Sequence, residues 1–262
     1  MHVEAIEIDI RNIEEHIEDQ HAGKDSQSIK SIAYGGVDGV ITTFSIIASA
    51  YGASLDYNII IIMGLSNLIA DGFSMGFGDY VSSRLENNYI KSEVLKETYE
   101  FHHNTNFEKQ ELIVLYKKKF NVTDNDAKQL VEIMSKYKDL FLQNMIRNEL
   151  NLEAETCSNK ELMQNSVYTF LSFVFFGFLP ITVYLIGLGI VNRNPDTIFI
   201  ISGTISACTL FLVGALVAFI TKQNKELVKN GCLTLSNGLI AFIIAYFIGW
   251  GFDKVLYMNS YN

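Results

Sequence analysis

Proline and cysteine are both scarce in this chain. Its 262 residues include two prolines and three cysteines, and no two cysteines are spaced as C-x-x-C. Neither a disulfide framework nor a thiolate metal site is therefore expected. Basic residues are also few, 20 against 29 acidic ones, which gives a net charge of −9. A surface that binds nucleic acid would be basic, so the composition argues against that class of function.

Charge is missing altogether from three long runs, although 19% of the chain is charged and 49% is hydrophobic. The runs cover residues 167–191, 197–221 and 231–252. A helix needs about 20 residues to cross about 30 Å of hydrocarbon, and irregular backbone cannot lie exposed to lipid. Each run therefore predicts a membrane-spanning helix. Pro180 is expected to kink the first of them, because proline removes a backbone donor.

Two further apolar runs carry isolated acidic residues. Residues 32–54 contain Asp38, and residues 57–83 contain Asp71 and Asp79. The first run begins too deep in the chain, behind an acidic segment, to be a cleaved signal peptide. The sequence thus predicts an all-α membrane protein with five spans. Its predicted parts are an acidic N-terminal segment (1–31), two spans that form the ion path (32–83), a cytoplasmic helical domain (84–166) and three spans (167–262).

The orientation follows from the basic residues of the short loops. Lys222, Lys225 and Lys229 crowd the loop after the fourth span, whereas the loop after the third span offers only Arg193. An excess of Lys and Arg in short loops marks the cytoplasmic side. We therefore expect the N-terminus and residues 84–166 to be cytoplasmic and the C-terminus to be lumenal.

Residues 84–166 are too many for a simple connection between spans. Their pattern predicts three helices, of which the first continues the second span to about His103 and the second covers Phe107 to Phe120. The third is predicted to run from Thr123 to Glu149 without a break. Thr123 and Asp126 have the spacing of a capping box at its start.

Glutamates recur on both sides of the turn between the first two of these helices. Glu93, Glu97 and Glu100 share one helix face, and so do Glu108 and Glu111 on the next helix. The intervening HHNTN turn folds the two faces toward each other, and gathered carboxylates repel unless a cation lies between them. Met145 and Glu149 are spaced four apart on the third helix. The alternative is an ordinary solvated hairpin rich in glutamate, in which His102 and His103 are simply exposed turn residues.

The first two spans carry the groups that predict an ion path. An ionisable residue in a membrane is costly and by default marks a functional site. Asp38 lies in YGGVDGVITTF and Met75 in ADGFSMGFGDY, both rich in small residues that permit close helix approach. One Asp and one Met coordinate a metal poorly, but a two-fold axis would double the ligand set. The alternatives are packing or lipid contact for Met75 and an interface hydrogen bond for Asp38.

Several stretches together resemble the vacuolar iron transporter family, over essentially the full length from about His16 onward. They are GGVDGVITTFSIIA and GLSNLIADGFSMGFGDYVS in the first two spans, the spacing of the four glutamates between 97 and 111, QNMIRNEL in the third cytoplasmic helix, and NGLIAFIIAYFIG in the last span. The resemblance implies a five-span homodimer with a cytoplasmic three-helix metal-binding domain.

The resemblance also implies an activity and a set of site residues. It implies export of cytosolic Fe²⁺, and of related ions such as Mn²⁺, Co²⁺ and Zn²⁺, into a vacuole-like compartment in exchange for protons. These ions are substrates, and no permanent cofactor is expected. Asp38 and Met75 match the family's pore ligands at the dimer axis. The cytoplasmic metal site is matched by Glu97, Glu100, Glu108, Glu111, Met145 and Glu149.

Two positions depart from the family pattern. Eight residues before the pore methionine the family often has Glu, and this chain has Asn67. Asp71 lies one turn from both Asn67 and Met75, so it can supply a carboxylate on the same face. The family often has a second methionine after Met145, and this chain has Ile146. The missing carboxylate at Asn67 affects the expected proton coupling. The missing thioether at Ile146 affects the expected metal preference.

Two other functions remain open at this point. A membrane-bound di-iron enzyme would use Glu-x-x-His motifs, and Glu100–His103 and Glu18–His21 have that spacing. Such bundles need two of these motifs on neighbouring helices and two further glutamates. The other alternative is a passive divalent-metal channel, which Asp38 would line equally well. A transporter, and not an enzyme, is the prediction that the sequence favours.

Overall fold

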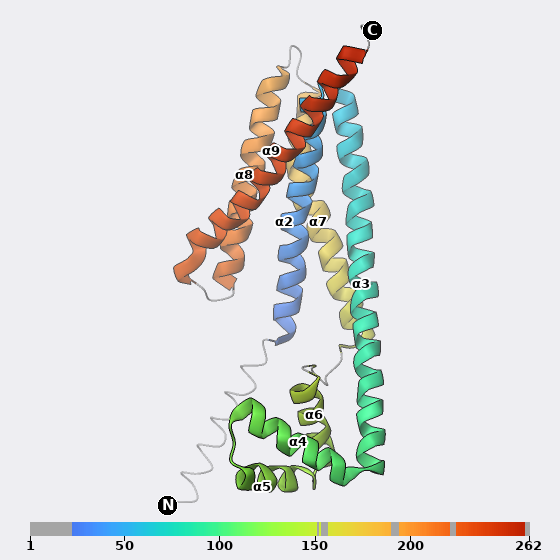
Figure 1. The fold of residues 1–262 in the computed structure, drawn as a ribbon. Helices are drawn as coiled ribbons and strands as arrows, with labels where there is room; N and C mark the ends of the chain where they lie inside the picture. Colours follow the sequence, from blue (N-terminus) through green and yellow to red (C-terminus); the bar gives the residue numbers. More distant parts are fainter. Residues whose placement is uncertain (1–22, 151, 153–156, 190–193, 221–223, 260–262) are drawn as a thin grey trace, which may run out of the picture. The chain divides into compact units, whose positions relative to one another are not determined.

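The computed structural model describes residues 23–150, 152, 157–189, 194–220 and 224–259. Among these residues the regular structure is helical throughout, as the sequence predicts (Figure 1). The chain divides into two compact units. Residues 1–79 and 164–262 form what we call the membrane unit, and Tyr80–Met163 forms what we call the hairpin unit.

Among the described residues, five helices are long and apolar enough to cross a membrane, which confirms the predicted number of spans. They are α2 (Gly23–Gly52), α3 (Tyr57–His103), α7 (Asn159–Gly187), α8 (Pro195–Ile220) and α9 (Leu227–Asn259). Most exceed the charge-free runs of the sequence because their polar ends are helical too. Helix α3 has 47 residues, or about 70 Å at 1.5 Å per residue, more than twice the thickness of the hydrocarbon. Its second half therefore lies outside any single membrane crossing, and the expected continuation to His103 is confirmed.

The core of the membrane unit is formed by apolar side chains from all five long helices. Helix α2 packs against α8 and α9, which also pack against each other. Pro180 lies inside α7, which continues to Gly187, and the carbonyl of Pro180 accepts a hydrogen bond from Ser202 of α8 at 2.9 Å. The largest core side chains are Val40, Phe44, Ile47, Leu68, Phe173, Ile181, Tyr184, Leu210 and Phe242.

The small residues of the first span have a contact within their own chain. A Cβ atom added to Gly35 would lie 2.5 Å from the carbonyl oxygen of Thr169, and one at Gly39 would meet the backbone of Phe173. Both partners belong to α7, so these glycines allow α2 and α7 to approach closely. Helix packing within one chain accounts for these glycines, so they do not by themselves indicate a contact between two copies.

The hairpin unit adds α4 (Thr105–Phe120), α5 (Asp124–Met134) and α6 (Lys138–Glu149) to the end of α3. A single residue, Asn104, separates α3 from α4 and makes the turn of the helical hairpin. Asn121 caps the C-terminus of α4 with a left-handed φ of 54°, a conformation that asparagine tolerates better than most residues.

The third predicted helix is not continuous, and here the prediction is wrong. Helices α5 and α6 are separate, with Tyr137 in extended conformation between them. Val131 of α5 and Met145 of α6 both belong to the small core around Phe101, Leu112 and Phe141. In one straight helix their Cα atoms would be about 21 Å apart along the axis. The break lets both side chains reach the same core.

Candidate metal centre and ion path

Three glutamates from the two arms of the hairpin meet in the hairpin unit. Glu97 and Glu100 lie on the last turns of α3, and Glu108 lies on the first turn of α4. One carboxylate oxygen from each lies within 4.8 Å of the others. Divalent cations hold oxygen ligands at about 2.0–2.6 Å, so one ion can contact all three. The hairpin therefore brings Glu97 and Glu100 of the first pair close to Glu108 of the second, whereas Glu111 is not part of this group.

Burial makes these carboxylates costly to ionise. Glu97 and Glu108 are each only 3% exposed. Desolvation, followed by the charges of Glu149, Glu100 and Glu108, raises the pKa of Glu97 to about 7. The pKa of Glu108 is raised by desolvation and then by Glu111 and Glu100. Buried like charges of this kind favour either a proton or a bound cation.

The remaining predicted ligands surround this group in different ways. The pKa of Glu149 on α6 is raised by desolvation and then by Glu111, so both carboxylates belong to the same electrostatic cluster. Met145 is 1% exposed and packs in the apolar core of the unit. Its role as a thioether ligand, and the direct coordination of a metal by Glu111 and Glu149, remain predictions.

Lys96 is a residue of this region that the sequence pattern did not single out. Its charge lowers the pKa values of Glu97, Glu108 and Glu149 against the larger effects that raise them. In return, Glu100 and then Glu93 raise the pKa of the exposed Lys96. Its position directly before Glu97 is the feature of the sequence that could have identified it. A single exposed ammonium compensates the cluster only weakly, which leaves it suited to a divalent cation.

The two histidines of the turn have other partners. The ring of His103 stacks on Tyr99, with centroids 3.8 Å apart, and its Nδ1 lies 2.8 Å from the Tyr99 carbonyl oxygen. His102 Nε2 lies 2.8 Å from the Nζ of Lys138. Neither ring belongs to the group of three glutamates. The second Glu-x-x-His motif, Glu18–His21, lies outside the described residues.

The predicted ion path involves α2 and α3 of the membrane unit. Asp38 lies on α2, and its carboxylate is electrostatically coupled to that of Asp71 on α3. Asp71 is exposed in the single chain, while Met75 and Asn67 are partly buried. Within the described ranges, Glu97, Glu100 and Glu108 are the one group of at least three acidic, histidine or cysteine residues with metal-site spacing. The acids of the ion path do not form such a site within one chain.

Asp79 has a structural explanation. Its carboxylate accepts a hydrogen bond from the Thr169 hydroxyl at 3.1 Å, which links α3 to α7. The Ser172 hydroxyl of α7 likewise donates to the Ile32 carbonyl of α2. These contacts hold the helices that carry Asp38 and Met75 in a defined arrangement. Of the residues used to predict orientation, Arg193 and Lys222 lie outside the described part of the chain.

Comparison with known proteins is consistent with this architecture. A family model described as the VIT family matches residues 29–250. The vacuolar iron transporter of Toxoplasma gondii is 33% identical over 236 residues, which cover 88% of this chain and 76% of that protein. The vacuolar iron transporter of Plasmodium berghei is 34% identical over 239 residues, covering 91% and 86%. Protein CCC1 of Saccharomyces cerevisiae is 26% identical over 172 residues, covering 64% and 52%.

The matched range begins before Asp38 and ends within α9, so it covers most of the first and last spans and all of the other three, together with the hairpin and the glutamate cluster. Both the extent of the match and the identity to these relatives lead to the same assignment. The chain belongs to the VIT family.

Proposed function

We propose that this protein moves divalent iron from the cytosol into a vacuole-like compartment, in exchange for protons. The proposal is supported by relatives that are named vacuolar iron transporters and by five helices able to span a membrane. The observation that carries it is the cluster of Glu97, Glu100 and Glu108, whose carboxylate oxygens lie within 4.8 Å of one another. Mn²⁺, Co²⁺ and Zn²⁺ are further candidate substrates, because oxygen ligands accept all of them.

The cytoplasmic cluster would collect metal ions and release protons as it does so. Glu97, with a pKa of about 7, is often protonated at neutral pH. A metal ion must displace that proton, since carboxylate ligands bind metals in their ionised form. The cluster thus concentrates ions at the cytosolic side without itself forming the membrane crossing.

Asp38 would carry the ion and the returning proton through the membrane. Its carboxylate can hold either one in turn, and Asp71 adds a second acid coupled to it. Asp71 takes the place of the carboxylate that Asn67 lacks. Met75 adds a thioether, a softer ligand that favours Fe²⁺ over Mn²⁺.

The ion path is proposed to be completed by a homodimer. One chain offers a single set of these ligands, and a two-fold axis doubles it. The support is the exposed position of Asp71 together with the exposed apolar side chains of Phe73 and Phe77 on the same helix. Single cysteines along residues 69–78 of α3 should crosslink between chains with helical periodicity. A monomeric mass in mild detergent, without crosslinks, would argue against the dimer.

The decisive test is metal uptake into vesicles that contain the purified protein, with and without a pH gradient. Proton exchange predicts Fe²⁺ uptake that increases when the trapped lumen is acidic. Uptake that ignores the pH gradient would indicate a passive channel. Oxidation of Fe²⁺ with turnover and without uptake would indicate a ferroxidase.

A further inference from the structure

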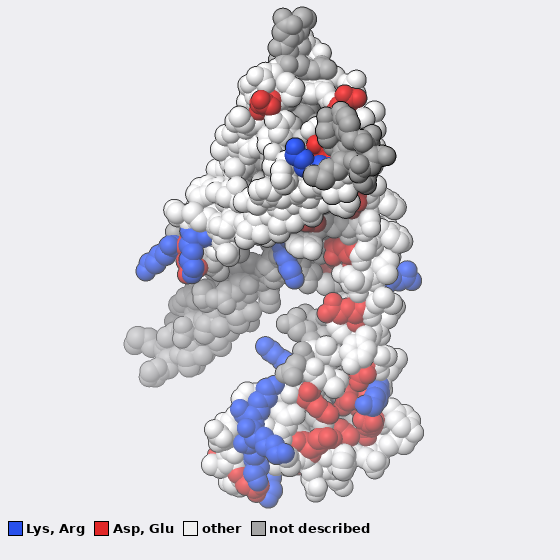
Figure 2. Space-filling model, turned by 45° about the horizontal axis from the view of Figure 1, so that its top comes forward, with Lys and Arg blue, Asp and Glu red and all other residues white. Residues whose placement is uncertain are grey.

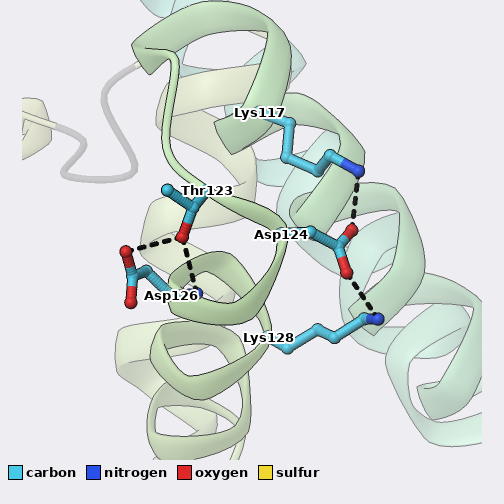
Figure 3. A network of polar contacts seen from close by, with 5 residues as sticks. All are labelled: Lys117, Thr123, Asp124, Asp126 and Lys128. Carbon is cyan, nitrogen blue, oxygen red and sulfur yellow. Dashed lines mark hydrogen bonds and ion pairs between the residues drawn. The ribbon is translucent and has the colours of Figure 1, made fainter.

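Acidic and basic side chains of the hairpin unit are largely separated. In Figure 2 the acidic ones form a group on this unit, and most basic ones lie apart from that group along another side. Lys117 and Lys128 both pair with Asp124, each at 2.6 Å (Figure 3), and Lys109 pairs with Glu132 at 3.0 Å. Neither of these acids belongs to the glutamate cluster formed by residues 97, 100 and 108. These three lysines are therefore directed to carboxylates outside the cluster.

Lys96 differs from these lysines because it lies among the glutamates of α3. Glu93 precedes it by three residues, Glu97 follows directly, and Glu100 follows four residues later. Residues four apart on a helix have Cβ atoms about 5–6 Å apart, so Lys96 is a neighbour of Glu100, a member of the cluster. Lys96 is exposed, whereas Glu97 is only 3% exposed. The ammonium is thus tethered beside the cluster, on its solvent side.

The charge of Lys96 also acts on the other helices of the unit. Against the larger effect of desolvation, it lowers the pKa of Glu108 on α4 and the pKa of Glu149 on α6. Lys109 directly follows Glu108 in the sequence, yet it is not among the charges that act most strongly on that carboxylate. Its Nζ lies 3.0 Å from Glu132 instead. The fold, and not proximity in the sequence, therefore makes Lys96 the cation beside the cluster.

A tethered cation has opposite effects on the empty cluster and on the occupied one. In the empty cluster the carboxylates repel one another, and the ammonium partly offsets this repulsion. When a divalent ion binds, the ammonium and the ion repel each other. Across about 6–10 Å of a water-like medium, that repulsion corresponds to roughly a three- to tenfold loss of metal affinity.

We propose that Lys96 sets the affinity of the glutamate cluster for divalent metal ions, by stabilising the empty cluster and opposing the bound ion. The inference rests on the proposed metal binding by Glu97, Glu100 and Glu108. Lys96 is not itself a ligand, because an ammonium group has no lone pair to donate. A site that collects ions for transport must also release them, and a weaker complex dissociates more readily.

The experiment measures Mn²⁺ binding by the full chain with calorimetry, at low and at high salt. Lys96→Gln removes the charge and should tighten binding by about three- to tenfold at low salt, with unchanged stoichiometry. In 1 M salt the screening length drops to about 3 Å, so most of this difference should disappear. Lys96→Arg keeps the charge and should bind Mn²⁺ like the parental chain.

A second measurement separates this role from a merely structural one. Without metal, the α4 amides of Lys96→Gln should exchange hydrogen faster than those of the parental chain, because the empty cluster has lost its cation. The variant should therefore be less stable when empty and yet bind metal more tightly. If Lys96 served only to support the fold, its loss would weaken both properties together.

Lys109→Gln is the matched control. It also removes a lysine next to a cluster glutamate, but one whose ammonium pairs with Glu132, and its Mn²⁺ affinity should stay within about twofold of the parental value. Equal affinities of Lys96→Gln and the parental chain at low salt would overturn the inference and leave the proposed function standing. Weaker binding by Lys96→Gln, or the same tightening in Lys109→Gln, would overturn it too. A parental chain that binds no Mn²⁺ would overturn the proposed metal site together with the inference.

Discussion

The hairpin unit and the membrane unit arrange their acidic residues in opposite ways. In the hairpin unit, Glu97, Glu100 and Glu108 converge to within 4.8 Å from two helices joined by one residue. In the membrane unit, Asp38 and Asp71 come from α2 and α3, and Asp71 is exposed. The first site is assembled by a local turn within one chain. The second offers few ligands per chain, which is why we propose that a second copy completes it.

This comparison supports separate proposed roles for the two units, metal binding in the hairpin unit and transport in the membrane unit. Mutations can remove either role. Removing the ion-path carboxylate should stop transport and leave metal binding by the hairpin unit intact. Removing the glutamates of the hairpin unit should remove most of that binding and only slow transport.

The largest effect is expected from Asp38→Asn. The substitution keeps the shape of the side chain and removes its charge and its titratable proton, so Fe²⁺ uptake by vesicles should fall to background. Metal binding by the hairpin unit should persist. Asp56→Asn, in the exposed loop between α2 and α3, is the control and should transport normally. Uptake by Asp38→Asn at the parental rate would place the pathway elsewhere.

The second prediction concerns the four paired glutamates of the hairpin unit. Changing Glu97, Glu100, Glu108 and Glu111 to Gln should remove most metal binding by the full chain, as measured by calorimetry, while uptake is slowed and not abolished. The control changes Glu86 and Glu132, two exposed glutamates of the same unit. An unchanged binding stoichiometry in the fourfold variant would contradict the assignment of the cluster.

The third prediction uses the pKa of Glu97, about 7 in the folded protein against an ordinary 4.5. Below pH 4.5 both folded and unfolded states are protonated, and the shift has no effect. As the pH rises toward 7, the unfolded state loses its proton first, so stability falls. Without metal, the folded unit should be less stable above pH 7 than below 4.5 by on the order of 3 kcal/mol from this group.

Hydrogen exchange of the α4 amides in chelator, corrected for intrinsic rates, measures this loss. Glu97→Gln should remove most of the pH dependence, and added metal should restore protection at neutral pH. Equal pH dependence in the parental chain and in the variant would show that Glu97 is not the responsible group.

The fourth prediction tests the soft ligand of the ion path. Met75→Leu keeps apolar volume and loses the sulfur. It should reduce Fe²⁺ uptake more than Mn²⁺ uptake, because manganese depends less on soft ligands. Leu65→Met, at another partly buried apolar position of α3, is the control for a changed side chain. An equal reduction of Fe²⁺ and Mn²⁺ uptake in Met75→Leu would show that Met75 acts through packing and not as a soft ligand.

The smallest effect is expected from Thr123→Ala. The Thr123 hydroxyl accepts a hydrogen bond from the Asp126 N–H at the start of α5 (Figure 3). Losing such a cap costs about 1 kcal/mol, which should appear as faster exchange in α5 alone. Metal binding should be unchanged, since Thr123 lies outside the cluster. A loss of binding would show that α5 supports the site more directly than this structure indicates.

Much of the fold follows from sequence periodicity and the lengths of the apolar runs. Five runs longer than about 20 residues fix the number of spans, and the Thr123–Asp126 spacing correctly located the start of α5. The break between α5 and α6 was not predictable in this way. Val131, Met134, Phe141 and Met145 keep a spacing that fits one continuous helix. The helix is interrupted because side chains from both of its halves pack in one small core.

The candidate site, too, could be predicted from the sequence only in part. The glutamates and Asp38 stood out as candidates by residue type and spacing, because carboxylates on one helix face or inside a span are costly without a role. The ligand roles of the glutamates and of Met75 followed only from the resemblance to the vacuolar iron transporter family. Lys96 and the burial of Glu97 were not identified. A residue's exposure depends on which helix packs over it, and that information is absent from local spacing.

The sequence by itself determined the five spans, the hairpin and the acidic residues of both candidate sites, because these depend on local periodicity and on the cost of charge in lipid. The tertiary structure decided three further matters. It brought three carboxylates within reach of one ion, it split the helix predicted over residues 123–149 into α5 and α6, and it placed Gly35 and Gly39 against α7 of the same chain. The physical reason is that packing acts between segments far apart in sequence, and it is the packed neighbour that sets distance, burial and pKa.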